Sequence, residues 1–116
     1  MDIDNFDYKG EPVKLDKERH LKYTIAGMKL LAKKYGSVME AFRRLQSIDE
    51  LSENDLDLIV DIAHAGLIHE DSKLTVAIVE NLLDMRNMTG LTLKMIAAFN
   101  GSNSDRDGDS EGEAKA

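Results

Sequence analysis

The chain has 116 residues, the usual size of one domain, and carries a net charge of −7. It has no cysteine, which excludes disulfides and fits a reducing cytoplasm, and no apolar run approaches the roughly 18 residues of a membrane-spanning helix. Only 5% of the residues are aromatic. Excess negative charge and few aromatic rings disfavour binding to a phosphate backbone, so nucleic acid and membrane are not expected partners.

The first 20 residues form a polar segment without a helical period. Lys9-Gly10 indicates a turn, and residues 11–15 are typical of a short edge strand that contains Pro12. We therefore expect a short strand or hairpin ahead of a helical body over residues 24–99, the two forming one domain over residues 1–100.

Two helices are predicted on either side of Gly36. Gly36 is the expected C-cap of the first helix, and Ser37 the N-cap of the second. Apolar residues share one face of the first helix at a 3.6-residue period: Ile25, Met28, Leu31, Ala32 and Tyr35. The corresponding stripe of the second helix is Val38, Ala41, Phe42 and Leu45.

The third helix has the clearest start signal. Ser52 and Asp55 have the spacing of a capping box. The following residues, 56–68, are apolar around most of the circumference apart from a polar stripe of Asp57, Asp61 and His64. Such a helix is buried on several sides, so we expect it at the centre, with Gly66 marking close packing or the end of the helix.

The last part of the helical body holds two further helices. Thr75 is the expected cap of the first, whose buried face would be Ile78, Val79, Leu82 and Leu83. The second runs to about Phe99 and ends at Asn100-Gly101, with a bend at Met88-Thr89-Gly90 or one kinked helix throughout. The fold class is thus all-α, a bundle of about five short helices.

Residues 101–116 contain no large apolar side chain and are rich in Gly, Ser, Asp and Glu, which predicts a disordered acidic tail. Asp105, Asp107 and Asp109 match the first ligands of a calcium loop. However, Ser110 and Ala116 stand where that loop needs glycine and glutamate, so the tail is interpreted as solvated.

No catalytic constellation is present: the chain has no glycine-rich phosphate loop, no nucleophile elbow and no His-Glu-x-x-His motif. Asp61 and His64, with His69 beyond them, could in principle hold a divalent metal. The two histidines are five residues apart and point to different sides of a helix, so a polar stripe is the preferred interpretation. We expect no enzyme, cofactor or metal, and no small-molecule substrate.

Charge is unevenly distributed along the chain. Residues 14–34 hold seven basic residues against two acidic ones, whereas residues 37–86 hold four against eleven. Complementary regions of this kind favour contacts between subunits, and we expect a homo-oligomer with Lys29, Lys33 and Lys34 as its basic self-association patch. The alternative is a helix-turn-helix DNA-binding regulator formed by the helices around Gly36, although the second helix offers few base-reading side chains.

Methionines cluster in the last two helices. Methionine serves both as core filler and on adaptable surfaces that grip varied apolar segments, and core filling is the commoner role. We nevertheless retain the hypothesis of a partner-binding surface in this region. Its residues would be Met85, Met88, Leu91, Met95 and Phe99.

Two segments resemble the tail assembly chaperones of long-tailed, siphovirus-type bacteriophages and prophages. The run VKLDKERHLKYTIAGMKLLAKKYGS, residues 13–37, is similar to the family's polar strand and helix ending in an aromatic-Gly-Ser step. The run IAHAGLIHEDSKLT, residues 62–75, is similar to its Ala-Gly-Leu, acidic loop and Leu-Thr cap. The lysines of the first helix depart from the acidic opening of that family.

This resemblance implies a non-enzymatic chaperone in the cytoplasm of the bacterial host. Its partner would be the tape measure protein, which it would keep soluble during tail morphogenesis, and the tail tube protein is a further partner to consider. The resemblance also implies self-association and a longer form made by frameshifting.

Overall fold

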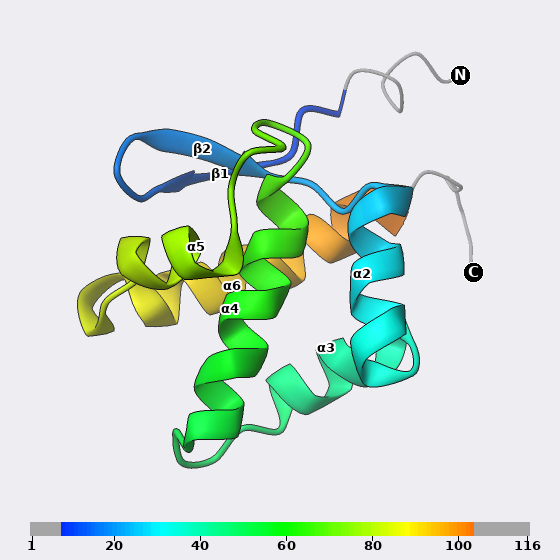
Figure 1. Ribbon diagram of the computed structural model, residues 1–116, viewed down its shortest axis with the longest axis vertical. Helices are drawn as coiled ribbons and strands as arrows, with labels where there is room; N and C mark the ends of the chain where they lie inside the picture. Colours follow the sequence, from blue (N-terminus) through cyan, green and yellow to red (C-terminus); the bar gives the residue numbers. More distant parts are fainter. Residues whose placement is uncertain (1–7, 104–116) are drawn as a thin grey trace.

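The computed structural model describes residues 8–103 (Figure 1). Over this range the chain forms a two-stranded antiparallel hairpin and five helices, which confirms the predicted helices and the N-terminal hairpin; the domain is therefore mostly helical rather than purely all-α. The elements are β1 (Glu11–Lys14), β2 (Glu18–Leu21), α2 (Ile25–Tyr35), α3 (Val38–Gln46), α4 (Glu53–Leu67), α5 (Val76–Leu82) and α6 (Met85–Asn103). No helix within residues 8–103 is long and apolar enough to cross a membrane.

The predicted caps are confirmed. The Ser52 hydroxyl accepts a hydrogen bond from the Asp55 amide, and the Asp55 carboxylate accepts one from the Ser52 amide, which completes the capping box of α4. The side chains of Thr24, Ser37 and Thr75 cap α2, α3 and α5 in the same way. Gly36 ends α2 at a φ of 92°, a conformation that glycine adopts without steric cost.

Helix α4 is the centre of the domain, as predicted, and packs against all the other described helices and against β2. Eight of its fifteen residues are buried. Gly27 of α2 allows the closest approach, because a Cβ placed there would lie 2.3 Å from the Ala65 carbonyl oxygen. Gly66 lies against Tyr23 and Leu21 and is the next-to-last residue of α4, so it marks both close packing and the end of the helix.

The hairpin is fixed to the helices along β2. The His20 amide donates to the Glu70 carboxylate at 3.0 Å, and His69 Nε2 lies 2.6 Å from the His20 carbonyl oxygen. Below these, the Lys22 amide donates to the Gly66 carbonyl at 2.9 Å. The outer edge of β2 is therefore covered by the end of α4 and the loop that follows it (Figure 1).

The turn of the hairpin holds a bidentate ion pair. Arg19 is only 6% exposed, and its Nε and Nη2 atoms each donate to an oxygen of Asp16 at 2.8 Å. These hydrogen bonds lower the pKa of Asp16 from 3.8 to about 2. The Asp16 carboxylate thus balances the charge of the buried Arg19 guanidinium. No pattern in the sequence predicts that Arg19 is buried.

The ion pair predicts a loss of stability in acid. Because the pKa of Asp16 is lower in the folded than in the unfolded chain, its contribution is present above pH 3.8 and is lost as the pH falls toward 2. We expect the urea midpoint to fall less over this range in Asp16→Asn than in the wild type. Glu80→Gln, which changes an exposed carboxylate on α5, should leave the fall as in the wild type. Equal falls in wild type and Asp16→Asn would contradict the prediction.

The C-terminal helices differ from the expectation in where they begin and end. The break between α5 and α6 lies at Leu83-Asp84, and Met88-Thr89-Gly90 is inside α6. Asp84 begins α6, because its carboxylate accepts hydrogen bonds from the amides of Arg86 and Asn87. Asn100-Gly101 does not stop the helix, which continues to Asn103 and passes against Tyr8 at Gly101. The rest of the predicted tail, from residue 104, lies outside the described residues.

The prediction that Ile25 and Ile78 are buried is wrong. Ile25 is 70% exposed and Ile78 is 45% exposed, although each begins a stripe of buried apolar residues on its helix. Both belong to the first turn of their helix, where the neighbouring elements do not cover them. Their exposure leaves apolar side chains on the outer surface of α2 and α5.

Candidate protein-binding site

The residues predicted to bind a partner are distributed between the core and the surface. Leu91, Met95 and Phe99 of α6 are 1%, 0% and 8% exposed, and Phe99 stacks on Phe42 with ring centroids 4.1 Å apart. Met88 is partly buried, and only Met85 is open to solvent at 71%. Core filling thus accounts for three of the five side chains, and their role toward a partner stays a prediction.

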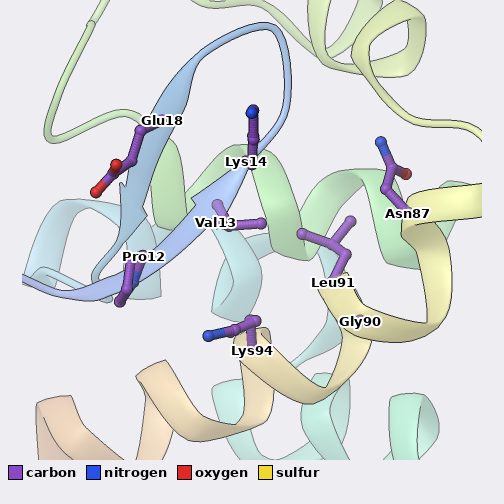
Figure 2. A pocket seen from close by; sticks show the side chains of 8 residues that line it. All are labelled: Pro12, Val13, Lys14, Glu18, Asn87, Gly90, Leu91 and Lys94. Atoms are coloured by element: carbon purple, nitrogen blue, oxygen red, sulfur yellow. The ribbon is translucent and has the colours of Figure 1, made fainter.

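A groove runs between the hairpin and the N-terminal half of α6 (Figure 2). Its volume is about 430 Å³. We call it the β1–α6 groove, and it is lined by Pro12, Val13, Lys14, Glu18, Asn87, Gly90, Leu91 and Lys94. Val13 and Leu91 point toward one another at its centre, whereas Lys14 and Asn87 lie at the rim. The groove therefore has an apolar floor and a polar rim, the usual design of a binding cleft.

The groove is bounded by a free strand edge. Pro12 pairs with His20, whose amide and carbonyl point away from β1 toward Glu70 and His69. Residues at alternate positions of an antiparallel pair turn their backbone groups outward, so Pro12 and Lys14 present theirs on the opposite edge. Pro12 has no N–H, which leaves the Lys14 amide and two carbonyl oxygens for a further strand. Within residues 8–103, no backbone group is bonded to them.

Gly90 forms the α6 wall of the groove. A Cβ placed at this glycine would have no neighbour within 4 Å. A glycine inside a helix costs up to about 1 kcal/mol relative to alanine, and here no close packing requires it. Its absent side chain leaves the space opposite β1 empty, so an incoming segment can approach the backbone of α6.

Of the three lysines of the predicted self-association patch, one forms an ion pair within the domain. Lys34 Nζ lies 2.8 Å from Asp61 Oδ2, and this hydrogen bond raises the pKa of Lys34. Tyr35 also donates to Asp61, at 2.5 Å, and its pKa is raised first by burial and then by that bond. Lys34 is therefore engaged with α4, whereas Lys29 and Lys33 lie on the outer side of α2 beside Leu30.

The polar residues weighed as metal ligands have structural partners. Asp61 binds Lys34 and Tyr35, and His64 Nε2 lies 3.0 Å from the Leu74 carbonyl oxygen. Among the described residues, no group of three or more His, Asp or Glu side chains could hold a metal ion. The arrangement agrees with the interpretation of this stripe as a polar seam along α4.

The helix-turn-helix alternative would use α3, the second helix after Gly36, to contact DNA. The arginines of α3 are already bound by a glutamate of the same helix. Glu40 accepts hydrogen bonds from Arg43 and Arg44 at 2.5–3.0 Å, and these bonds lower its pKa to about 2. Phe42 of the same helix is buried. A recognition helix whose two arginines are both held by its own glutamate is poorly suited to phosphate contacts.

Comparison with known proteins gives no relative: no protein family model, no curated protein and no solved structure matches this chain.

Proposed function

We propose that this protein is a tail assembly chaperone of a long-tailed bacteriophage or prophage. It would bind the tape measure protein in the cytoplasm of the bacterial host and keep it soluble while the tail is built, without enzymatic activity. The tail tube protein is a further partner under this proposal. Support comes from the resemblance of residues 13–37 and 62–75 to that family, and from the helical domain that those residues form.

The observation that carries the proposal is the β1–α6 groove. It combines an apolar floor, a free strand edge and the space left by Gly90 along one open cleft. Such a cleft can shield an apolar segment of a partner through side-chain burial and backbone pairing without reading a fixed sequence. A chaperone for a long apolar protein needs this kind of contact and no catalytic group.

The net charge of −7 suits the same role. Net charge away from zero helps a complex that covers apolar segments to stay in solution. The exposed acidic residues of α4 and α5, which are Glu53, Asp57 and Glu80, lie outside the groove and do not become covered when the groove is occupied.

The proposal is tested by co-expression with the long neighbouring open reading frame that, under this proposal, encodes the tape measure protein. We expect the tape measure protein to appear in the soluble fraction and to co-purify with the wild-type protein. A tape measure protein that remains insoluble and unbound in the presence of well-folded wild type would overturn the proposed function.

Substitution of Gly90 locates the contact. Gly90→Gln places a long helix-favouring side chain in the groove, and Gly90→Ala adds only a methyl group to the same empty space. We expect at least about a tenfold loss of co-purified tape measure protein with Gly90→Gln, equivalent to about 1.4 kcal/mol of binding, and little change with Gly90→Ala. Retention of the partner by Gly90→Gln would place the contact elsewhere on the molecule.

A further inference from the structure

The outer side of α2 combines free lysines with exposed apolar side chains. Ile25 and Leu30 are 70% and 44% exposed, and Lys29 and Lys33 lie beside them, one helical turn apart. Within residues 8–103, neither lysine takes part in an ion pair. We call these four residues the α2 face. The opposite side of the helix is buried through Gly27 and Leu31, so the α2 face is directed away from its own domain.

A second surface carries the opposite charge. The cavity at the corner between α3 and α4 has a volume of about 600 Å³, and its mostly polar lining includes the apolar side chains of Ile48 and Leu58. Its free carboxylates are Asp49, Glu50 and Asp57, which form no ion pair with any described residue. We call this surface the α3–α4 corner.

Two cations also line the α3–α4 corner, but both are already engaged. Lys34 is bound by Asp61 at 2.8 Å, and Arg44 is bound by Glu40 at 3.0 Å. The charge that remains available to a partner is therefore negative. Leu51 and Leu56, which directly follow the lining residues Glu50 and Asp55 in the sequence, are 43% and 39% exposed.

We propose that the α2 face of one copy of this chain docks on the α3–α4 corner of a second copy. Lys29 and Lys33 would pair with the free carboxylates of the corner, while Ile25 and Leu30 would cover its exposed leucines. The two surfaces carry opposite charges and both expose apolar side chains, so the contact is complementary. It does not depend on the proposed binding of a tape measure protein.

The two surfaces belong to different parts of the molecule, and this sets the kind of assembly. In Figure 1, α2 stands at the right, and the connection from α3 to α4 lies at the lower end of α4. A contact between two different patches leaves one unused patch at each end of a dimer. Association should therefore continue beyond the dimer as the protein concentration rises, and it should weaken with salt.

Charge reversal on each surface tests this contact by sedimentation velocity of the full chain. The first variant is Lys29→Glu with Lys33→Glu, and the second is Asp49→Lys with Glu50→Lys. We expect concentration-dependent association of the wild type and at least about a tenfold weakening in each variant alone. An equimolar mixture of the two variants should form a complex again, because the intact acidic corner of the first meets the intact α2 face of the second. Lys73→Glu is the control, since this exposed lysine lies outside both surfaces.

Circular dichroism of each variant serves as the folding control, and only folded variants are used to interpret the association. A wild type that stays monomeric at the highest attainable concentration would overturn the proposal. So would two folded variants that fail to associate in the mixture, or an acidic-corner variant that associates like the wild type.

Discussion

Phe42→Ala should lower the free energy of unfolding by about 3–5 kcal/mol, the usual cost of removing a buried aromatic ring. The Phe42 side chain is 1% exposed, stacks on Phe99 and meets Tyr23 edge-on with ring centroids 5.2 Å apart. The three rings join α3, α6 and the segment after β2, so the cavity left by alanine lies where three parts of the chain meet. Because small domains are stable by only about 5–15 kcal/mol, this loss is a large fraction of the total.

Urea unfolding followed by far-ultraviolet circular dichroism measures this effect. Met39→Ala is the matched control, since Met39 lies on the same helix but is 66% exposed. We expect the control to change the free energy of unfolding by no more than about 0.5 kcal/mol. Similar losses in the two variants would contradict the burial of the aromatic cluster.

Gly27→Ala should be the other strongly destabilising substitution, although it adds only a methyl group. The new Cβ would lie 2.3 Å from the Ala65 carbonyl oxygen, which is far inside van der Waals contact. That oxygen belongs to the backbone of the buried central helix, so α2 as a whole must move away from α4. Overpacking of this kind costs about 1–3 kcal/mol and occasionally more.

Gly90→Ala makes the same chemical change on α6 with the opposite expected result. No atom lies within 4 Å of the added Cβ, and alanine is favoured over glycine inside a helix by about 1 kcal/mol. We therefore expect the urea midpoint to rise for Gly90→Ala and to fall for Gly27→Ala. A fall for both variants would show that α6 packs more tightly at Gly90 than described.

The local signals in the sequence were sufficient to place most helix starts. Caps such as Ser52 with Asp55 act within one turn, so their effect does not depend on the rest of the fold. Asp84 and Asn87 form a similar reciprocal pair at the start of α6, and this spacing could have been found from the sequence. Met88-Thr89-Gly90 is the stronger turn signal in the sequence and favours a bend a few residues too late.

Features that depend on tertiary contacts were not predictable in the same way. Strand β2 contains the polar run Glu-Arg-His-Leu, and its place in a sheet depends on Glu70 and His69, about 50 residues later in the chain. Arg19 is buried because Asp16 folds back onto it, which no periodicity indicates. Helix α6 passes through Gly90 and Gly101 because packing overrides helix propensity.

The candidate site likewise combines features that local sequence patterns predict with features that depend on tertiary contacts. Apolar spacing correctly aligned Leu91, Met95 and Phe99 on one face of α6, but that pattern is the same for a core face and for a partner-binding face. Only the position of the hairpin over α6 distinguishes the two, and it leaves the free edge of β1 beside Gly90. The binding surface thus arises between elements that are about 75 residues apart, where no local pattern can indicate it.

The most direct test of the account is an amide-resolved NMR titration of the isotope-labelled protein with peptides that together span the tape measure protein. We predict that one or more peptides bind and that the largest shifts cluster around the β1–α6 groove, at Lys14, Gly90 and Lys94. The Lys14 amide should also become protected from hydrogen exchange, because it is the free donor of the strand edge. Binding that shifts only residues outside the groove, or no binding by any peptide, would contradict the account.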